Sequence, residues 1–554
     1  MASVLVDKLH RLERAGSSAP LTVLIRCASG RSPGVAAALE SLAFELVYVG
    51  VRTIAARATG KMLPQLSSLA FLEDVEPARV LFPAVDVGCR AIGIQGMVAA
   101  GRSGKGVALA VIDTGVDPKH RDFQSATGKS ALEALVWVPA DAPTMPGKAI
   151  TFGRKAIDTA LAKGEELPGD SNGHGTHCTS IAAGTGTSSA GRFAGVATGS
   201  DLFAVGMASL DNASVLVGIQ EVLRLVGDRP AVFSLSLATH YGSHDGNDPL
   251  EVEIDALSGP GRIFVVAAGN DADKQIHWRG ELREALCIPF ELTDPTAQGL
   301  VVYVAGTAAV EATLVLPTGE TIEASNSDPL ETDCGTVSVT MSGHLPQDAM
   351  QIFVAIYNAE EESSWELRLS AASGGARSVH AWGIATSPHR QKRIFTVPEI
   401  SHTVAIPGTA RRAITVGSFV SKTTFESEDG AHDDPDIGAG EPSLFSGRGP
   451  TRDGRDKPDL LAPGQYVTAA LSSTCDFAKN KEEYKGIRHP TKGYVTMDGT
   501  SMATPFVAGA IALALEDEPS LTPEEIKARI QRAAAAEGVP PAEWHLDVAA
   551  LLSA

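Results

Sequence analysis

The sequence predicts an α/β fold with a doubly wound, mostly parallel sheet, to which a small N-terminal α+β domain and an all-β insert are added. The first observation is a set of short, almost wholly apolar segments separated by helical ones, at 107–112, 202–205, 231–235 and 263–268. Strands that are apolar along their whole length are typical of parallel sheets covered by helices on both faces. The other two observations are the stretches that break this pattern, before residue 106 and between Cys287 and Trp382.

Length and composition indicate a folded protein of several parts. The 554 residues are 44% hydrophobic and 20% charged, which allows a substantial core and argues against general disorder. The net charge of -20 arises from 66 acidic and 46 basic residues. Because this charge has the wrong sign for nucleic acid or an anionic membrane, neither is an expected partner.

The N-terminal part predicts a separate small domain over residues 21–84, after an extension over 1–20. Its segments read β-α-β-β-α-β: a strand at 21–26, a helix at 34–42, a hairpin at 44–60, a short helix at 61–69 and a strand at 75–82. This order is that of the split-βαβ unit. A connector is expected over 85–105.

The main α/β domain is predicted in two parts, 106–270 and 403–554, with the insert at 271–402. The insert contains alternating or β-branched runs with Gly, Asn, Asp and Pro between them, at 301–306, 312–317, 336–342, 351–357 and 364–370. Such runs predict a sandwich of antiparallel strands. Parallel-sheet character returns at 413–419, and helical segments follow Ser501.

Cysteine usage and the N-terminus favour a cytoplasmic protein. The six cysteines include no CxxC pair and are too sparse for a disulfide scaffold. Charged residues interrupt the first sixteen positions, where a signal peptide needs an apolar stretch. The apolar runs are also shorter than the roughly 20 residues that span a bilayer, so we expect no membrane association.

Three short motifs carry chemistry. Asp113 ends the first apolar strand, at the carboxyl edge of the predicted sheet, where ligand sites of α/β proteins gather. His174 lies in Asn-Gly-His-Gly-Thr-His at the start of a helix-like segment, and Ser501 lies in Asp-Gly-Thr-Ser-Met-Ala-Thr-Pro at the start of another. An acid, an imidazole and a hydroxyl at element ends can form an orienting group, a base and a nucleophile.

In this order and with these flanks, the motifs resemble the subtilisin-like serine protease family. The resemblance covers about 106–270 and 407 to the C-terminal region. Asn270, which closes Ala-Ala-Gly-Asn, is similar to the family's oxyanion asparagine, and 445–450, 457–459 and 462–464 are similar to its approach to the serine. The first domain resembles the family's inhibitory propeptide, whose C-terminal tail lies in the active-site cleft. The insert resembles the jelly-roll insertion of Csp-type bacterial subtilases.

The resemblance implies a mechanism. Ser501 attacks the scissile carbonyl, neutral His174 accepts its proton, and Asp113 holds the imidazole tautomer. Asn270 and the Ser501 N–H bind the oxyanion, with one such donor contributing about 3 kcal/mol. The rate is expected to fall as the pH drops through the pKa of His174, nominally about 6.5. His177 is expected to be structural, and Cys178 a small buried residue.

The resemblance also places the substrate antiparallel to Ser236, Leu237 and Ala238, with Gly269 in the substrate-binding set. Ala238 and Thr239 stand where the family usually has glycine. Their side chains predict a narrower cleft, and the preferred substrate side chain stays open.

No cofactor and no metal are expected. The loop 101–106 has glycines and a lysine, but it precedes a strand instead of following one. His240 and His244 have a metal-ligand spacing, but glycines predict a loop there. The acidic run 426–436 is expected to be a solvated loop, and 184–191 lacks the carboxylates of a calcium loop.

The resulting hypothesis is a serine endopeptidase made as an autoinhibited precursor. Its expected partners are a protein or peptide substrate and its own N-terminal domain as an intramolecular inhibitor, with a cut between about Phe82 and Gly101. Two alternatives remain. A catalytically silent binding or signalling platform predicts a damaged triad, whereas Asp113, His174 and Ser501 are all present. A peptide ligase that uses the same acyl-enzyme is compatible with the sequence.

Overall fold

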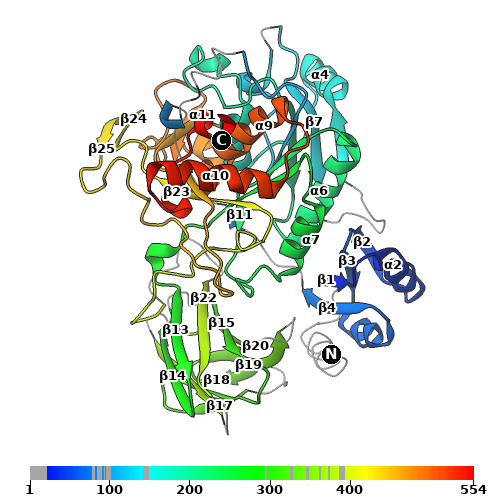
Figure 1. The fold of residues 1–554 in the computed structure, drawn as a ribbon, viewed down its shortest axis with the longest axis vertical. Coiled ribbons are helices and arrows are strands. Elements are labelled where there is room, and N and C mark those ends of the chain that lie inside the picture. The colour runs from blue at the N-terminus through cyan, green and yellow to red at the C-terminus, as the bar shows by residue number, and fades with distance from the viewer. Residues whose placement is uncertain are drawn as a thin grey trace.

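The fold is described from a computed structural model of the chain. The described residues are 21–77, 82–83, 90–92, 94, 101–125, 127–140, 149–292, 296–324, 329–344, 349–360, 363–371, 375–385 and 394–553. The predicted extension over 1–20 lies outside them, as does much of the predicted connector. Figure 1 shows a large α/β body, a small domain beside it and a β-rich insert projecting from it.

An eight-stranded sheet forms the centre of the α/β body. Its strand order is β26-β23-β12-β10-β6-β9-β7-β8. The pairs are parallel except for the edge pair β7–β8. The bounds are β6 Ala108–Ile112, β7 Leu132–Val138, β8 Ile150–Gly153, β9 Asp201–Met207, β10 Ala231–Leu235, β12 Arg262–Ala267, β23 Ile414–Phe419 and β26 Leu460–Pro463. The predicted fold class is therefore confirmed.

Helices cover both faces of this sheet, which explains why its strands are apolar throughout. In β6, Leu109 and Val111 pack in one core cluster with residues of α5 (His174–Ala183) and α9 (Thr500–Asp517). Ala108, Ala110 and Ile112 pack in the opposite cluster with α6 (Asn212–Val226) and α7 (Pro249–Leu257). Successive side chains point to opposite faces, so every position of the strand is buried.

The remaining elements of the α/β body surround this core. They are α4 Arg154–Lys163, α8 Asp476–Lys479, α10 Pro523–Glu537, α11 Val548–Ser553, β24 Thr424–Ser427, β25 Gly430–Asp433, β27 Val467–Ala470 and β28 Tyr494–Met497. Short 3-10 helices lie at Arg90–Ile92, Arg121–Phe123, Thr187–Ser189, Ala272–Lys274 and Pro541–Glu543. A membrane-crossing helix would need more length and apolar character than any helix in the described ranges has.

The N-terminal domain has the predicted order of elements, with two corrections. Its four-stranded sheet runs β2-β3-β1-β4, and its elements are β1 Leu21–Cys27, α2 Ser32–Ser41, β2 Glu45–Val49, β3 Thr53–Ala58, the 3-10 helix Gly60–Ser68 and β4 Leu72–Pro77. The second helix is 3-10 because Pro64 lies inside it and has no N–H to donate. The last strand was expected at 75–82; it begins earlier, after a turn at Phe71 with φ 70°, and ends at Pro77.

The insert is a two-sheet sandwich. One sheet has the order β13-β22-β15-β20-β19-β18 and the other β14-β21-β16-β17. The bounds are β13 His277–Leu282, β14 Ala285–Glu291, β15 Ala297–Ala305, β16 Glu311–Val315, β17 Thr321–Glu323, β18 Leu330–Thr332, β19 Gly335–His344, β20 Ala349–Tyr357, β21 Ser364–Ser370 and β22 Arg377–Ala385. Side chains of both sheets share one core cluster, which includes Trp365 and Trp382. The closer likeness to a jelly roll stays a prediction.

Candidate active site

Asp113 follows β6 directly and is fully buried at the carboxyl edge of the sheet. Its Oδ1 accepts a hydrogen bond from the backbone N–H of Thr114 at 2.7 Å. The same oxygen lies 2.6 Å from His174 Nδ1. The Asp113 carboxylate is thus held by the backbone of the turn that follows it. Because it faces Nδ1 of His174, it favours the tautomer with the proton on that nitrogen.

His174 is the first residue of α5 and is 1% exposed. The residue before it, Gly173, has φ 94°, a left-handed conformation that favours glycine. A Cβ at Gly173 would also lie 3.0 Å from Cys475 Sγ. Glycine at this position therefore lets the chain turn sharply and present the imidazole at the helix start.

Ser501 is the second residue of α9, and its hydroxyl lies at the same sheet edge. Its Oγ donates to the carbonyl of Ser236 at 2.9 Å, and Ser236 Oγ donates to the carbonyl of Ser501 at 2.7 Å. These two reciprocal bonds join the start of α9 to the chain that follows β10. The predicted nucleophile is thereby fixed against the predicted substrate-binding segment.

Cys178 links the three predicted catalytic residues in space. Its Sγ lies 3.8 Å and 3.9 Å from the two ring nitrogens of His174, and it donates to the Ser501 carbonyl at 3.5 Å. Burial raises the pKa of this thiol to about 11, so it is a neutral, small group at neutral pH. The expectation of a buried residue is met. These contacts connect Asp113, His174 and Ser501 in space, and their catalytic roles stay a prediction.

Asn270 is oriented by Thr500, the residue before the serine. Its Oδ1 accepts from the Thr500 N–H at 2.8 Å and from the Thr500 hydroxyl at 2.9 Å. Because the backbone N–H can only donate, the side-chain atom that faces it must be the oxygen. The amide NH₂ of Asn270 is then directed away from Thr500 and is available to bind developing negative charge.

Gly269 supports this arrangement through its backbone. Its N–H donates to Thr500 Oγ1 at 3.1 Å, and its carbonyl accepts from Gly447 N–H at 2.9 Å. With φ 97°, a Cβ at this position would lie 2.7 Å from Ala405 Cβ. Its proposed contact with substrate stays a prediction, and its observed role is to position Asn270.

Asp170 is a site residue that the motifs did not reveal. It is fully buried, and its Oδ1 accepts from the Thr114 hydroxyl and the Gly173 N–H, both at 2.8 Å. Its Oδ2 accepts from the N–H and hydroxyl of Thr176. This one carboxylate ties the turn after Asp113 to the start of the histidine helix. The available signal was its position four residues before His174.

The predicted substrate-binding segment forms the short strand β11 (Leu237–Ala238). It pairs antiparallel with β5 (Phe82–Pro83), with Leu237 opposite Pro83 and Ala238 opposite Phe82. Thr239 pairs on with Ile406 through two backbone hydrogen bonds of 2.9 Å. A strand from the N-terminal region thus occupies the edge that the sequence assigned to substrate.

His177 is structural, as expected. Its Nε2 lies 3.1 Å and 3.2 Å from the carbonyls of Val467 and Val495. Burial lowers the pKa of His177 to about 3, so the ring is neutral and donates to strands β27 and β28. It braces the far side of α5.

The electrostatics of His174 depend on two opposed effects. Burial disfavours the imidazolium, but the Asp113 carboxylate in contact with the ring outweighs this and raises the pKa of His174 well above its ordinary value. The pair is therefore built to stabilise the imidazolium that forms when a hydroxyl proton is accepted.

Three sequence features considered for other chemistry have structural roles. In the glycine-rich loop, the N–H groups of Ser103 and Gly104 donate to Glu516 on α9, so a carboxylate of the protein occupies them. The acidic run 426–436 was expected to be a loop, and this is corrected: its residues up to Asp433 lie in the two-stranded hairpin β24–β25. His240 and His244 lie in a loop, as expected, with their rings stacked at 5.3 Å.

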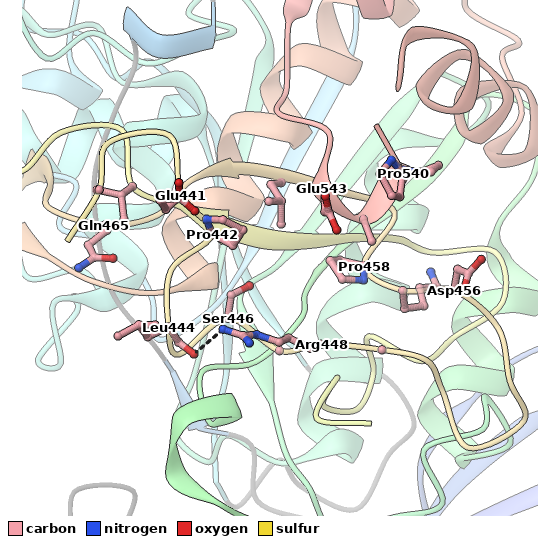
Figure 2. Close-up of a pocket in the computed structure, with 18 of the residues that line it drawn as sticks. Glu441, Pro442, Leu444, Ser446, Arg448, Asp456, Pro458, Gln465, Pro540 and Glu543 are labelled. Carbon is pink, nitrogen blue, oxygen red and sulfur yellow. Dashed lines mark hydrogen bonds between the residues drawn. The ribbon is translucent and has the colours of Figure 1, made fainter. Parts of the chain in front are cut away.

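A pocket of about 750 Å³ lies apart from the triad (Figure 2). The loop from 436 to 465 and the 3-10 turn at Pro541–Glu543 form its walls, and Arg448 Nη2 donates to the Leu444 carbonyl there. None of the predicted catalytic residues lines it. We therefore assign the chemistry to the triad edge and not to this pocket.

Comparisons with known proteins bear on the family and the fold. The profile of the Subtilase family matches residues 104–343 and 398–544. Serine protease AprX of Bacillus subtilis (strain 168) is 25% identical over 426 residues, which are 77% of this chain and 60% of that protein. A PI-type proteinase of Lactococcus lactis subsp. cremoris is 23% identical over 509 residues, which are 81% of this chain and 25% of that protein. The chain thus spans less than two thirds of both relatives.

The fold has a counterpart among solved structures. The structure of the Clostridium perfringens CspB protease aligns with a TM-score of 0.66 and 24% identity, covering 84% of this chain and 96% of that one. At this identity the likeness bears on the fold alone.

Proposed function

Because the chain belongs to the Subtilase family of serine proteases, we propose that it is an endopeptidase that works through an acyl-enzyme on Ser501. The observation that carries the proposal is the buried Asp113–His174 pair, 2.6 Å apart, joined through Cys178 to the Ser501 turn. Ser501 attacks the peptide carbonyl and gives its proton to His174, which then delivers it to the leaving amine. Water repeats the sequence to release the acyl group.

Stabilisation of the oxyanion is supported by Asn270. Thr500 holds the Asn270 oxygen through two hydrogen bonds, so the NH₂ group is preorganised before substrate arrives. A preorganised donor costs no reorganisation during the reaction and acts where water is excluded. The Ser501 N–H, at the positive end of α9, is the natural second donor.

Labelling by a fluorophosphonate tests this proposal. We expect wild-type protein, freed of its N-terminal domain, to be labelled and Ser501→Ala to be unlabelled, while Ser520→Ala, which alters an exposed serine, keeps the label. Product masses from a peptide library then separate hydrolysis from ligation, since ligation yields joined peptides. A silent binding platform would give neither label nor cleavage, and that result would overturn the proposal.

We also propose that the chain is made as an autoinhibited precursor. The pairing of β5 with β11 supports this, because a substrate peptide would need the same edge. Because β5 runs antiparallel to β11, Phe82 lies opposite Ala238 and Pro83 opposite Leu237, so β5 points toward Ser236. The Ser236 carbonyl accepts a hydrogen bond from Ser501. Counting on from Pro83 by that register makes the bond after Ala84 the first candidate for the cut.

Packing of the N-terminal domain supports the same proposal. Leu24, Val47, Tyr48 and Ala55 share a core cluster with α6 and α7, and Figure 1 shows the domain beside these helices. On α7, the buried carboxylate of Glu253 accepts from Tyr48 Oη at 2.9 Å and from the N–H groups of Val51 and Arg52 at 2.6 Å and 2.9 Å. These contacts hold the domain so that its tail reaches the cleft.

A further inference from the structure

Three buried histidines meet where the β-rich insert joins the α/β body. His277 begins β13, His380 lies on β22, and His402 lies where the chain returns from the insert. Their exposed fractions are 0%, 5% and 7%. One nitrogen from each ring lies within 4.8 Å of one from each of the others.

The closest pair of nitrogens has the spacing of a metal site. His277 Nε2 and His380 Nδ1 are 3.1 Å apart. Two imidazole nitrogens bound to one tetrahedral Zn²⁺ at about 2.0–2.1 Å lie about 3.3 Å from each other. The third ring is close, since the ring centroid of His402 is 5.1 Å from that of His277 and 4.7 Å from that of His380. All three rings thus offer a nitrogen to one small volume.

Side chains next to the three histidines are also typical of a metal site. Glu399 Oε2 lies 3.9 Å from Nδ1 of His277 and 4.0 Å from Nδ1 of His402. Histidines that bind metal commonly present the other ring nitrogen to such a carboxylate. Glu399 Oε2 and His277 Nδ1 are both buried without a hydrogen-bond partner among the described residues. Ser401 Oγ, at 2.8 Å, is a further partner for His402 Nδ1.

The surrounding charges permit a cation. Arg452 is paired with Asp245, and its guanidinium also donates to the Ser243 carbonyl at 2.9 Å. Arg279 is exposed to solvent. Trp382 covers the cluster, with its ring 4.9 Å from His277 and 5.6 Å from His380, and its Nε1 donates to the His402 carbonyl. Trp382 therefore shields the three rings on one side, and the Glu399 carboxylate faces two of them.

We propose that His277, His380 and His402 bind one Zn²⁺ ion that anchors the insert to the α/β body. Three neutral imidazoles favour Zn²⁺ and similar transition metals over Ca²⁺ or Mg²⁺, which prefer oxygen ligands. A water molecule would complete the tetrahedron. The ion would join the segment that enters the insert to the segment that leaves it. His277 lies seven residues after Asn270. His402 lies three residues before Ala405, whose N–H donates to the Ala268 carbonyl. The sequence did not suggest this site because its ligands are up to 125 residues apart, from 277 to 402.

Titration with Co²⁺, a coloured substitute for Zn²⁺, tests the proposal. Full-length Ser501→Ala protein, which is unable to digest itself, is stripped with a chelator and titrated with Co²⁺. We expect one Co²⁺ per chain, with visible d–d bands of a four-coordinate site that one equivalent of Zn²⁺ abolishes. Zn²⁺ should also raise the thermal unfolding midpoint of the stripped protein.

Variants identify the ligands. His380→Ala and His402→Ala should lose at least about 100-fold in Co²⁺ affinity, and Glu399→Gln about 10-fold. His432→Ala removes a partly exposed histidine on β25 and should bind as the parent does. If His402→Ala does not fold, His402→Asn is used instead, because the Asn side chain is closer in size to the imidazole than Ala is. Unchanged midpoints of the metal-free variants show that folding is intact.

A second candidate group must be separated from this one. Asp113, His174 and Cys178 also place ligand atoms within 4.8 Å of one another. Cys178→Ser should leave the Co²⁺ signal unchanged, and no thiolate-to-cobalt charge-transfer band should appear. Loss of binding in Cys178→Ser, or its retention in the His380 and His402 variants, would overturn the proposal, as would the absence of stoichiometric binding.

Discussion

Thr500 and Asn270 show how a single residue next to the nucleophile can prepare the site for charge. The Thr500 N–H and hydroxyl both donate to Asn270 Oδ1, while the hydroxyl accepts from Gly269. The amide is thus fixed on one side by the same turn that carries Ser501. The proposed oxyanion donor and the proposed nucleophile are therefore positioned together, by one short stretch of backbone.

Truncation of Asn270 should act on the transition state. We expect Asn270→Ala to lower kcat by about 100- to 1000-fold, with a smaller effect on KM, because the amide donates mainly to charge that develops during the reaction. Steady-state kinetics on a peptide substrate provide the measurement. Asn480→Ala, which alters an exposed asparagine at the end of helix α8, is the matched control. A KM effect with unchanged kcat would assign Asn270 to ground-state binding instead.

The pH dependence follows from the His174–Asp113 contact. His174 must be neutral to accept a proton, and contact with Asp113 raises its pKa above about 6.5 despite burial. The acid limb of kcat/KM should therefore lie above pH 6.5, with activity lost as pH falls through the raised pKa. Asp113→Asn removes the carboxylate but leaves His174 buried, which should lower the pKa of His174. The acid limb of the remaining activity should therefore move to lower pH. A limb that stays in place would show that another group titrates.

Individual residues also show what sequence reasoning can reach. Asp113, His174 and Ser501 were predicted because each lies in a local motif at the end of an element. Asp170 and the orienting role of Thr500 were not, because their importance depends on which distant N–H groups face them in the fold. The histidines of the proposed metal site likewise come from separate strands and loops.

At the scale of elements, α7 is the part of the α/β body that recognises the N-terminal domain. Glu253 is fully buried and receives three donors from the β2–β3 hairpin. The same hairpin contacts α6, where Gln220 Nε2 donates to the Val49 carbonyl at 2.9 Å. The β2–β3 turn thus supplies several of the polar contacts that hold the N-terminal domain, beside the apolar contacts of Leu24 and Ala55.

Loss of Glu253 should weaken this hold. In Glu253→Ala three donors, of which Tyr48 Oη is buried, lose their carboxylate acceptor, a cost of about 3 kcal/mol, or roughly 100-fold in affinity. After the chain is cut, we expect the N-terminal fragment to separate from the Glu253→Ala protein on gel filtration and peptidase activity to appear sooner. Glu221→Ala, which alters a carboxylate on α6 bonded to Arg224 and Thr151, should retain the fragment. Equal retention in both variants would remove Glu253 from the interface.

Element boundaries were predicted well where the apolar pattern is strong and poorly where backbone chemistry decides. The strands at 231–235 and 263–268 match β10 and β12 closely. The strand predicted at 75–82 failed because Pro77 ends its pairing and Phe82–Pro83 joins another sheet. The strands β7, β8 and β26 were not predicted, because their periodicity did not stand out from the surrounding loops.

At the scale of the whole molecule, the N-terminal domain, the cleft and the insert lie around one edge of the central sheet. The domain packs on α6 and α7, its following strand pairs with β11, and the insert leaves and re-enters beside Asn270. The N-terminal domain and the strand that pairs with β11 are therefore joined by a short connection between β4 and β5. This connection sets how the first cut can occur.

The first cut should be intramolecular. Because residues 78–81 alone separate β4 from β5 in the sequence, the tail is held at the cleft at a high effective concentration. We expect wild-type protein to be cut near Ala84 with a half-time that does not change over a 100-fold dilution, and Ser501→Ala to remain one chain. Intact-mass analysis against time, at several protein concentrations, measures both the position and the order of the reaction. A half-time that lengthens in proportion to dilution would instead mean that one molecule cuts another. The β5–β11 pairing would then be a purely inhibitory contact.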